Sequence, residues 1–301
     1  MAELPDTLEE WWDDFVRSLR RKNRSDKTIT RYRASFERFW RWALAQGHQP
    51  DPSGFTHHDI NAWTDHLRTE TTLQPVTVTT TWTNARPFWS WWASEIDEPS
   101  PFTRADHPGD HLPPVSVRSI DEIRALLATC STKSFRDRRD EAIIRIFYDS
   151  GPRVAELVGM DVTSWDRKHD WIEVLGKGSK PRIIPTGTRT GEALARYVRA
   201  RRTHPDVHQD RLWLGRKGPL RVSGVEQMLA RRSERAGVDR IAPHQLRHTW
   251  SHQFRMAGGS DSDLMYLAGW ETTAMAARYG RSAAAERARE AHRAISPGDR
   301  L

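Results

Sequence analysis

Several features that mark other classes of protein are missing from this 301-residue chain. A single cysteine, Cys130, excludes an intramolecular disulfide and favours the reducing cytoplasm. No stretch of about 18 apolar residues is present, so no membrane span is expected. The acidic start, MAELPDTLEEWWDD, lacks the apolar segment of a signal peptide. The clustered carboxylates that a metal-dependent nuclease needs are absent from the sequence as well.

Positive charge, by contrast, is concentrated in the second half of the chain. Residues 1–97 carry 12 basic and 14 acidic side chains, whereas residues 118–301 carry 34 and 23, a net charge of +11. A basic surface of this size favours a polyanionic partner such as nucleic acid. A proteome rich in arginine would produce the same excess of basic residues, so charge alone does not establish a nucleic-acid partner.

Proline divides the chain. Residues 98–117 contain five prolines and few large apolar residues, which predicts a linker between residues 1–97 and 118–301. Helical spacing of apolar residues predicts four helices before the linker, at about 7–19, 29–43, 56–67 and 76–94. Capping boxes, Thr7-x-x-Glu10 and Thr56-x-x-Asp59, are expected to open the first and third.

The second part is expected to be mostly helical with one β-hairpin. Short β-rich runs at Trp171–Leu175 and Arg182–Pro185 flank GKGSKP, which places Lys177 in the turn. Helices are predicted near 119–127, 140–149, 191–201, 223–236, 244–257, 260–268, 272–279 and 282–294. The chain is therefore predicted to be mainly α with a small β element, an α+β fold.

One basic cluster stands out in the first part. Between residues 17 and 33 only Asp26 opposes a run of cations, namely Arg17, Arg20, Arg21, Lys22, Arg24, Lys27, Arg31 and Arg33. The functional interpretation is contact with DNA phosphates. The structural alternative is an ordinary solvated helix–loop surface.

Arg153 follows a Gly-Pro turn, and Glu156 lies three residues later on the same helical face. The functional interpretation is that Arg153 holds a phosphate oxygen while Glu156 orients it. The alternative is a simple intrahelical ion pair.

His244 and Arg247 share one face at a helix start that Pro243 announces. Helix N-termini favour phosphate. The spacing of His244, His248 and His252 also allows a zinc site, but no acidic or cysteine ligand is near and Arg247 would repel a cation. No metal and no cofactor are therefore expected.

Lysines and one tyrosine complete the candidate set. Lys177 in its glycine-flanked turn can protonate a leaving oxygen, and Lys180 or Arg182 could take that role or contact the DNA backbone. Tyr279, nine positions after Trp270, is the candidate nucleophile, with Tyr266 as its main competitor. About one tyrosine in a thousand is ionised at pH 7, so the phenolate costs about 4 kcal/mol unless neighbouring cations help.

Taken together, these motifs resemble the phage integrase family of tyrosine recombinases along nearly the whole chain. The resemblance implies a helical core-binding domain and a catalytic domain that form a C-shaped DNA clamp. It implies that Arg153, Arg247, His244 and Lys177 are catalytic, with Glu156 in support and Tyr279 as nucleophile. Most members carry His at the position of Trp270. Because an indole N–H donates one hydrogen bond and exchanges no proton, Trp270 should serve in phosphate contact and packing.

The family's chemistry implies a 3′-phosphotyrosyl intermediate and a free 5′-hydroxyl, without ATP or metal. It also implies four protomers on two double-stranded DNA sites, action at the nucleoid, and in some systems an accessory directionality factor. A type IB topoisomerase and a catalytically idle DNA-binding factor remain alternatives. The first helix begins near residue 7, so an extra arm-binding domain is not expected, which favours simple-site or Xer-like recombination.

Overall fold

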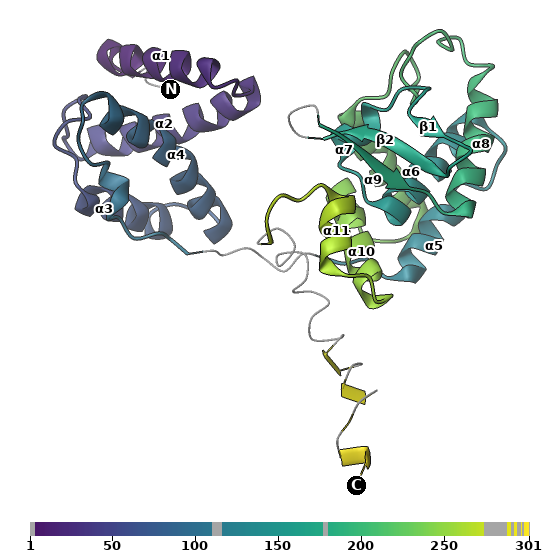
Figure 1. Ribbon diagram of the computed structural model, residues 1–301. Coiled ribbons are helices and arrows are strands. Elements are labelled where there is room, and N and C mark those ends of the chain that lie inside the picture. The colour runs from purple at the N-terminus through teal and green to yellow at the C-terminus, as the bar shows by residue number, and fades with distance from the viewer. Residues whose placement is uncertain are drawn as a thin grey trace. The chain divides into compact units, whose positions relative to one another are not determined.

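The computed structural model describes residues 4–109, 116–176 and 180–273, together with 288–289, 292–293, 296 and 298–300. The chain divides into two compact units, Met1–Pro113 and Pro114–Leu301 (Figure 1). Both are built mainly from helices, and the second carries one small sheet. The predicted fold class, mainly α with a small β element, is confirmed.

Four helices form the N-terminal unit: α1 (Asp6–Arg21), α2 (Asp26–Ala45), α3 (His57–Thr69) and α4 (Pro75–Glu95). They enclose a core of aromatic rings that pack edge to face, as where Phe39 meets Trp40, Trp63 and Trp89 at centroid distances of 5.5, 5.2 and 5.1 Å. Trp40 and Trp63 are completely buried. The helices expected from apolar spacing are therefore confirmed, within a few residues at each end.

The two predicted capping boxes behave differently. The Thr56–Asp59 box is present at the start of α3. The Thr7–Glu10 box is wrong, because α1 already begins at Asp6, directly after Pro5. Thr7 therefore lies inside the first turn, and its hydroxyl donates across the fold to the Pro50 carbonyl at 3.4 Å.

The proline-rich segment is folded onto the N-terminal unit as far as Gly109. Its short helix η1 (Pro101–Thr103) buries Phe102 in the aromatic core, against Trp82 at a centroid distance of 4.9 Å. Asn61 and Asp106 exchange hydrogen bonds of 2.8 and 2.9 Å. Proline ends helices without preventing tertiary packing, so its sequence density marks irregular chain rather than unpacked chain.

The C-terminal unit begins with α5 (Ile120–Ala128), α6 (Phe135–Ser150) and the short α7 (Val154–Val158). The sheet follows, and then come α8 (Thr188–Arg201), α9 (Val222–Ala236), α10 (Pro243–Met256) and α11 (Asp261–Ala268). A turn of 3-10 helix, η3 (Gly298–Arg300), lies in the tail. The helices predicted at 272–279 and 282–294 lie outside the described residues, apart from a few isolated positions. Helix α6 starts five residues before the predicted 140, because Ser134 caps it.

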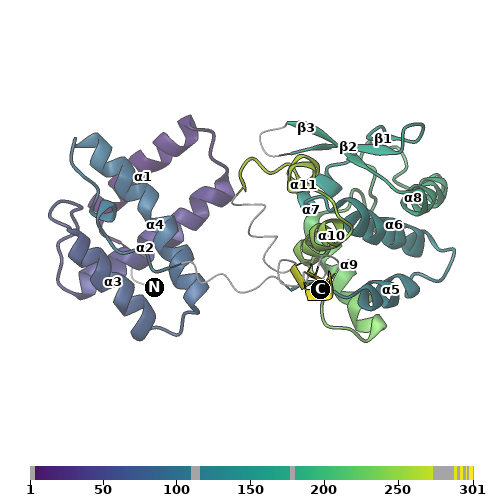
Figure 2. The same cartoon turned by 60° about the horizontal axis from the view of Figure 1, so that its bottom comes forward.

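The predicted hairpin is confirmed and gains a third strand. Strands β2 (Trp171–Leu175) and β3 (Pro181–Pro185) pair antiparallel with Ile172 opposite Ile184, and β1 (Trp165–Asp166) adds to the free edge of β2. With two residues, β1 is too short to show an alternating pattern. Figure 2 shows α11 lying below β3 and beside α10, and both neighbours touch it.

Candidate active site

The turn from α6 into α7 fixes the first arginine. Gly151 takes a left-handed conformation with φ of 55°, and a Cβ there would collide with the Trp250 ring at 2.1 Å, so only glycine fits. Arg153 follows as the residue that caps α7. Its Nη1 donates to Oε1 of Glu156 at 2.8 Å, and its backbone N–H donates to Oε2 at 2.7 Å. Glu156 is 5% exposed, so this pairing is far more rigid than a surface ion pair.

A second arginine reaches the same carboxylate. Arg182 on β3 donates from Nη2 to Oε2 of Glu156 at 2.6 Å and from Nη1 to the Leu267 carbonyl. Its side chain is only 12% exposed. The sequence placed Arg182 among residues that contact DNA, but its guanidinium is turned into the protein instead. Burial and pairing, which a motif does not display, account for the difference.

Arg247 on α10 is 3% exposed and donates to the carbonyls of Gly151 at 2.6 Å and Ala268 at 2.7 Å. Its guanidinium carbon lies 5.5 Å from the centre of the Trp270 ring, within the range of a cation–π contact. Trp270 itself is 6% exposed. The side chains of Arg247 and Trp270 are therefore in contact.

The end of α11 gathers these side chains. Three consecutive carbonyls, of Leu267, Ala268 and Gly269, accept hydrogen bonds from Arg182, Arg247 and Arg153 in that order. The last carbonyls of a helix lack intrahelical partners and carry its negative partial charge, so cations stabilise them. One helix end therefore holds arginines from three different elements in a fixed arrangement.

The electrostatics of this cluster are consistent with binding an anion. Burial raises the pKa of the Glu156 carboxyl, but the charge of Arg182 and the hydrogen bonds from Arg153 outweigh it, and the net pKa is lowered. The pKa of Arg182 is lowered chiefly by burial, which Glu156 partly offsets. Three arginines against one carboxylate leave excess positive charge, which suits a phosphate.

A hollow of about 360 Å³ opens beside the cluster. Its lining includes Arg153, Lys180, Tyr266 and Trp270. Lys180 is exposed and lies 3.5 Å from the Glu271 carboxylate. Tyr266, the competing nucleophile, is 75% exposed. Lys177 and Tyr279 lie outside the described residues.

His244 is exposed in the first turn of α10, and its ring centre lies 6.4 Å from that of the buried His248. Within the described ranges, no three His, Cys, Asp or Glu side chains form a group that could hold a metal. Nor is any helix of the described chain long and apolar enough to cross a bilayer.

The N-terminal basic cluster is only partly available to a partner. Arg33 is held by Glu9 and Glu37, the latter at 2.7 Å, and Arg17 pairs with Asp14. The remaining members of the cluster are exposed at the α1–α2 turn and in the first turns of α2: Arg20, Arg21, Lys22, Arg24, Lys27 and Arg31.

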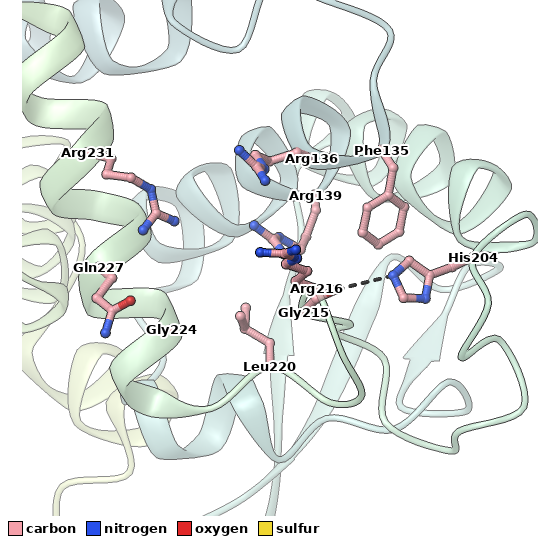
Figure 3. Close-up of a pocket in the computed structure, with 10 residues that line it drawn as sticks. All are labelled: Phe135, Arg136, Arg139, His204, Gly215, Arg216, Leu220, Gly224, Gln227 and Arg231. Carbon is pink, nitrogen blue, oxygen red and sulfur yellow. Dashed lines mark hydrogen bonds between the residues drawn. The ribbon is translucent and has the colours of Figure 1, made fainter.

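A second basic hollow of about 660 Å³ lies elsewhere in the C-terminal unit (Figure 3). Arg231 and Gln227 of α9 face Arg136 and Arg139, which lie in the first turns of α6. Arg153 follows the opposite end of α6, so this hollow is separate from the cluster on α11. Its residues share no short motif, so the sequence alone did not predict this hollow.

Buried arginines held by helix-end carbonyls, beside a hollow that the exposed Lys180 borders, form a basic site that suits a phosphodiester. The sequence pattern of the phage integrase family matches residues 119–286, more than half of the chain. The chain belongs to the phage integrase family. It is a tyrosine recombinase, as the motifs predicted, and hence a site-specific DNA recombinase; the topoisomerase and idle-binder alternatives are not favoured.

Curated relatives are similar over different shares of their length. The tyrosine recombinase XerC of Staphylococcus saprophyticus is 30% identical over 262 residues, which cover 86% of this chain and 87% of the relative. XerC of Corynebacterium efficiens is 37% identical over 125 residues, 41% of this chain and 40% of its own.

Solved structures share the fold at low identity. XerH bound to palindromic difH DNA aligns with a TM-score of 0.71 at 14% identity, covering 90% of this chain and 80% of that one. The Tn1549 transposon integrase with transposon right-end DNA gives 0.71 at 18%, covering 95% and 99%.

Proposed function

We propose that this recombinase cleaves and rejoins double-stranded DNA at specific sites through a 3′-phosphotyrosyl link to Tyr279. The observation that carries the proposal is the convergence of Arg153, Arg247 and Trp270 at the end of α11, nine residues before Tyr279. DNA-bound relatives such as XerH support duplex DNA as the partner.

Each side chain then has a distinct task. Tyr279 gives up its phenolic proton to solvent and attacks the scissile phosphorus; the bond between phosphorus and the 5′-oxygen breaks, and that oxygen leaves with a proton from Lys177. Arg153, Arg247, His244 and Trp270 stabilise charge on the non-bridging oxygens, while Glu156 keeps Arg153 in place. The 5′-hydroxyl of the partner strand reverses the step, so the energy of the phosphodiester is conserved and no ATP is needed.

The two units divide the work. Residues 1–97 bind the DNA site, with Arg20, Arg21, Lys22, Arg24 and Lys27 on its phosphates and Lys180 beside the cleaved strand; residues 98–117 connect them to the catalytic residues 118–301. Four protomers assemble on two sites, in the cytoplasm at the nucleoid, with an accessory factor setting direction. The similarity to XerC supports recombination as the reaction that these units carry out.

Trapping the covalent intermediate tests the nucleophile. Wild-type protein and the Tyr279→Phe and Tyr266→Phe variants are incubated with fragmented DNA of the source replicon, then denatured and examined for protein-linked DNA. We expect adducts from wild type and Tyr266→Phe but none from Tyr279→Phe, and sequencing the trapped DNA gives the site. An adduct that survives in Tyr279→Phe and is lost in Tyr266→Phe would reverse the assignment.

A further inference from the structure

We propose that Arg182 is a positioning residue for strand cleavage, which acts by holding Glu156 and the end of α11 so that Arg153 meets the scissile phosphate in a fixed orientation. This inference rests on the proposed function. Arg182 borders the same hollow as Arg153, but its terminal N–H groups are directed at Glu156 and at the end of α11.

Arg182 first fixes the carboxylate of Glu156. Glu156 accepts from Arg153 on both oxygens, and Arg182 adds a 2.6 Å bond to Oε2. A buried carboxylate needs several donors to stay ionised and in place. Without Arg182, Glu156 loses its largest charge partner and can rotate, and the Nη1 of Arg153 moves with Oε1.

Arg182 also fixes the end of α11. Arg182 also donates to the Leu267 carbonyl, one residue before the acceptor of Arg247 and two before that of Arg153. An added Cβ on Gly269 would lie 3.0 Å from both Cδ and Nε of Arg182, so the chain passes tightly over this side chain. Arg182 thereby fixes the segment that leads into Trp270.

Only an arginine at this position can make both interactions, one with Glu156 and one with the end of α11. Its planar guanidinium directs N–H groups along separate directions, here to Glu156 on α7 and Leu267 on α11. A lysine ammonium is a single point that can approach one acceptor closely. The Arg182→Lys variant should therefore be intermediate between wild type and Arg182→Met.

The test measures the single-turnover rate of covalent adduct formation on the DNA segment recovered with wild type, nicked beside the cleaved bond so that the reaction is irreversible. A misplacement of about 1 Å can cost about 100-fold, and we expect that loss for Arg182→Met, with a smaller loss for Arg182→Lys. Because the terminal N–H groups of Arg182 are directed at Glu156 and Leu267, the Kd for the same segment should change less than about threefold, which is under 1 kcal/mol.

A neutral scissile group separates positioning from general damage. On the same DNA with a methylphosphonate at the cleaved position, one anionic oxygen is gone, and Arg153 has less charge to stabilise. The deficit of Arg182→Met relative to wild type should shrink to within about tenfold, as should that of Arg153→Ala. A deficit of equal size on both substrates, or cleavage by Arg182→Met near the wild-type rate on phosphate, overturns the inference.

Arg196→Met is the matched control. Arg196 also shares a buried carboxylate with a second arginine: Glu141 accepts from Arg196 at 2.9 Å and from Arg145 at 3.0 Å. It lies on α8, outside the cluster, so its loss should leave cleavage within about twofold. Failure of wild type itself to form any adduct would overturn the proposed function, whereas a normal wild type with an active Arg182→Met would overturn this inference alone.

Discussion

The two units bury different kinds of residue. Within residues 4–109 every buried polar side chain is a Ser or Thr, and the core is aromatic. In the described part of the C-terminal unit the buried set includes charged side chains, listed here: Asp137, Arg139, Asp140, Glu141, Glu156, Arg201, Arg232, Arg247 and Arg255. The core of the first unit consists of packed aromatic and other apolar side chains. The second unit also buries arginines that are hydrogen-bonded to carboxylates and carbonyls.

This difference fits the division of work proposed above. Surface cations on long side chains suffice to track a DNA backbone, and the core beneath them can be apolar. Stabilising charge at one phosphorus requires donors in a fixed geometry, which favours arginines held in place by carboxylates and carbonyls. The predictions below test this contrast.

The largest loss of stability is expected when one buried tryptophan of the N-terminal unit is replaced by alanine. Trp40 is fully buried among Phe39, Phe55 and Trp89, so Trp40→Ala should cost about 3–5 kcal/mol of unfolding free energy. Urea denaturation followed by tryptophan fluorescence measures it. Trp11→Ala, at a partly buried position, is the control and should cost less. Equal costs would show that the buried aromatic packing is not what stabilises this unit.

Acid should weaken the C-terminal unit through its buried carboxylates. Burial raises the pKa of Asp137, but hydrogen bonds from Arg232 and Thr132 outweigh it and lower the value to about 2. Against an unfolded value near 3.9, this contributes about 2–3 kcal/mol of stability, present above about pH 4 and lost as pH falls through about 2. Denaturation between pH 6 and 2 should be flatter for Asp137→Asn; identical slopes would argue against this linkage.

Two glycines with the same backbone geometry isolate the contact with Arg182. Gly269 and Gly237 both end helices with φ near 65°, at 63° and 67°. A Cβ on Gly237 meets nothing within 4 Å, whereas one on Gly269 crowds Arg182 at 3.0 Å and reaches ordinary contact with Nη1 of Arg153 at 3.6 Å. Both alanine variants should lose about 1–2 kcal/mol from backbone strain.

Only Gly269→Ala should also slow adduct formation, because it displaces Arg182. If both variants cleave at the same rate, the close approach of Gly269 to Arg182 has no role in the reaction.

The smallest effect is expected at the exposed basic turn of the N-terminal unit. Arg21→Ala should lower the slope of log K against log salt by about 0.9, the value for one phosphate contact, with little change in stability. Filter binding at several salt concentrations measures the slope. Arg104→Ala, an exposed arginine outside the turn, is the control. An unchanged slope for Arg21→Ala would assign this turn to the solvated surface.

Sequence patterns reached most of the fold. Apolar spacing located the helices, and β-rich runs around GKGSKP located the hairpin, because periodicity depends only on which face of an element is buried. The Thr7 box failed because a capping motif does not say at which residue the helix begins. Strand β1 was missed because two residues are too few to show alternation, and only their pairing with β2 identifies them as a strand.

By itself the sequence predicted which side chains would do the chemistry, and its motifs pointed to Arg153, Glu156, Arg247 and Trp270, which the structure brings together. Only the tertiary structure shows how these side chains are held. It places Arg182, which the sequence assigned to DNA contact, in a hydrogen bond with Glu156. The reason is physical. A motif records residue type and local spacing, whereas hydrogen bonds from Arg182, Arg247 and Arg153 to three successive carbonyls of α11 join segments up to 116 residues apart.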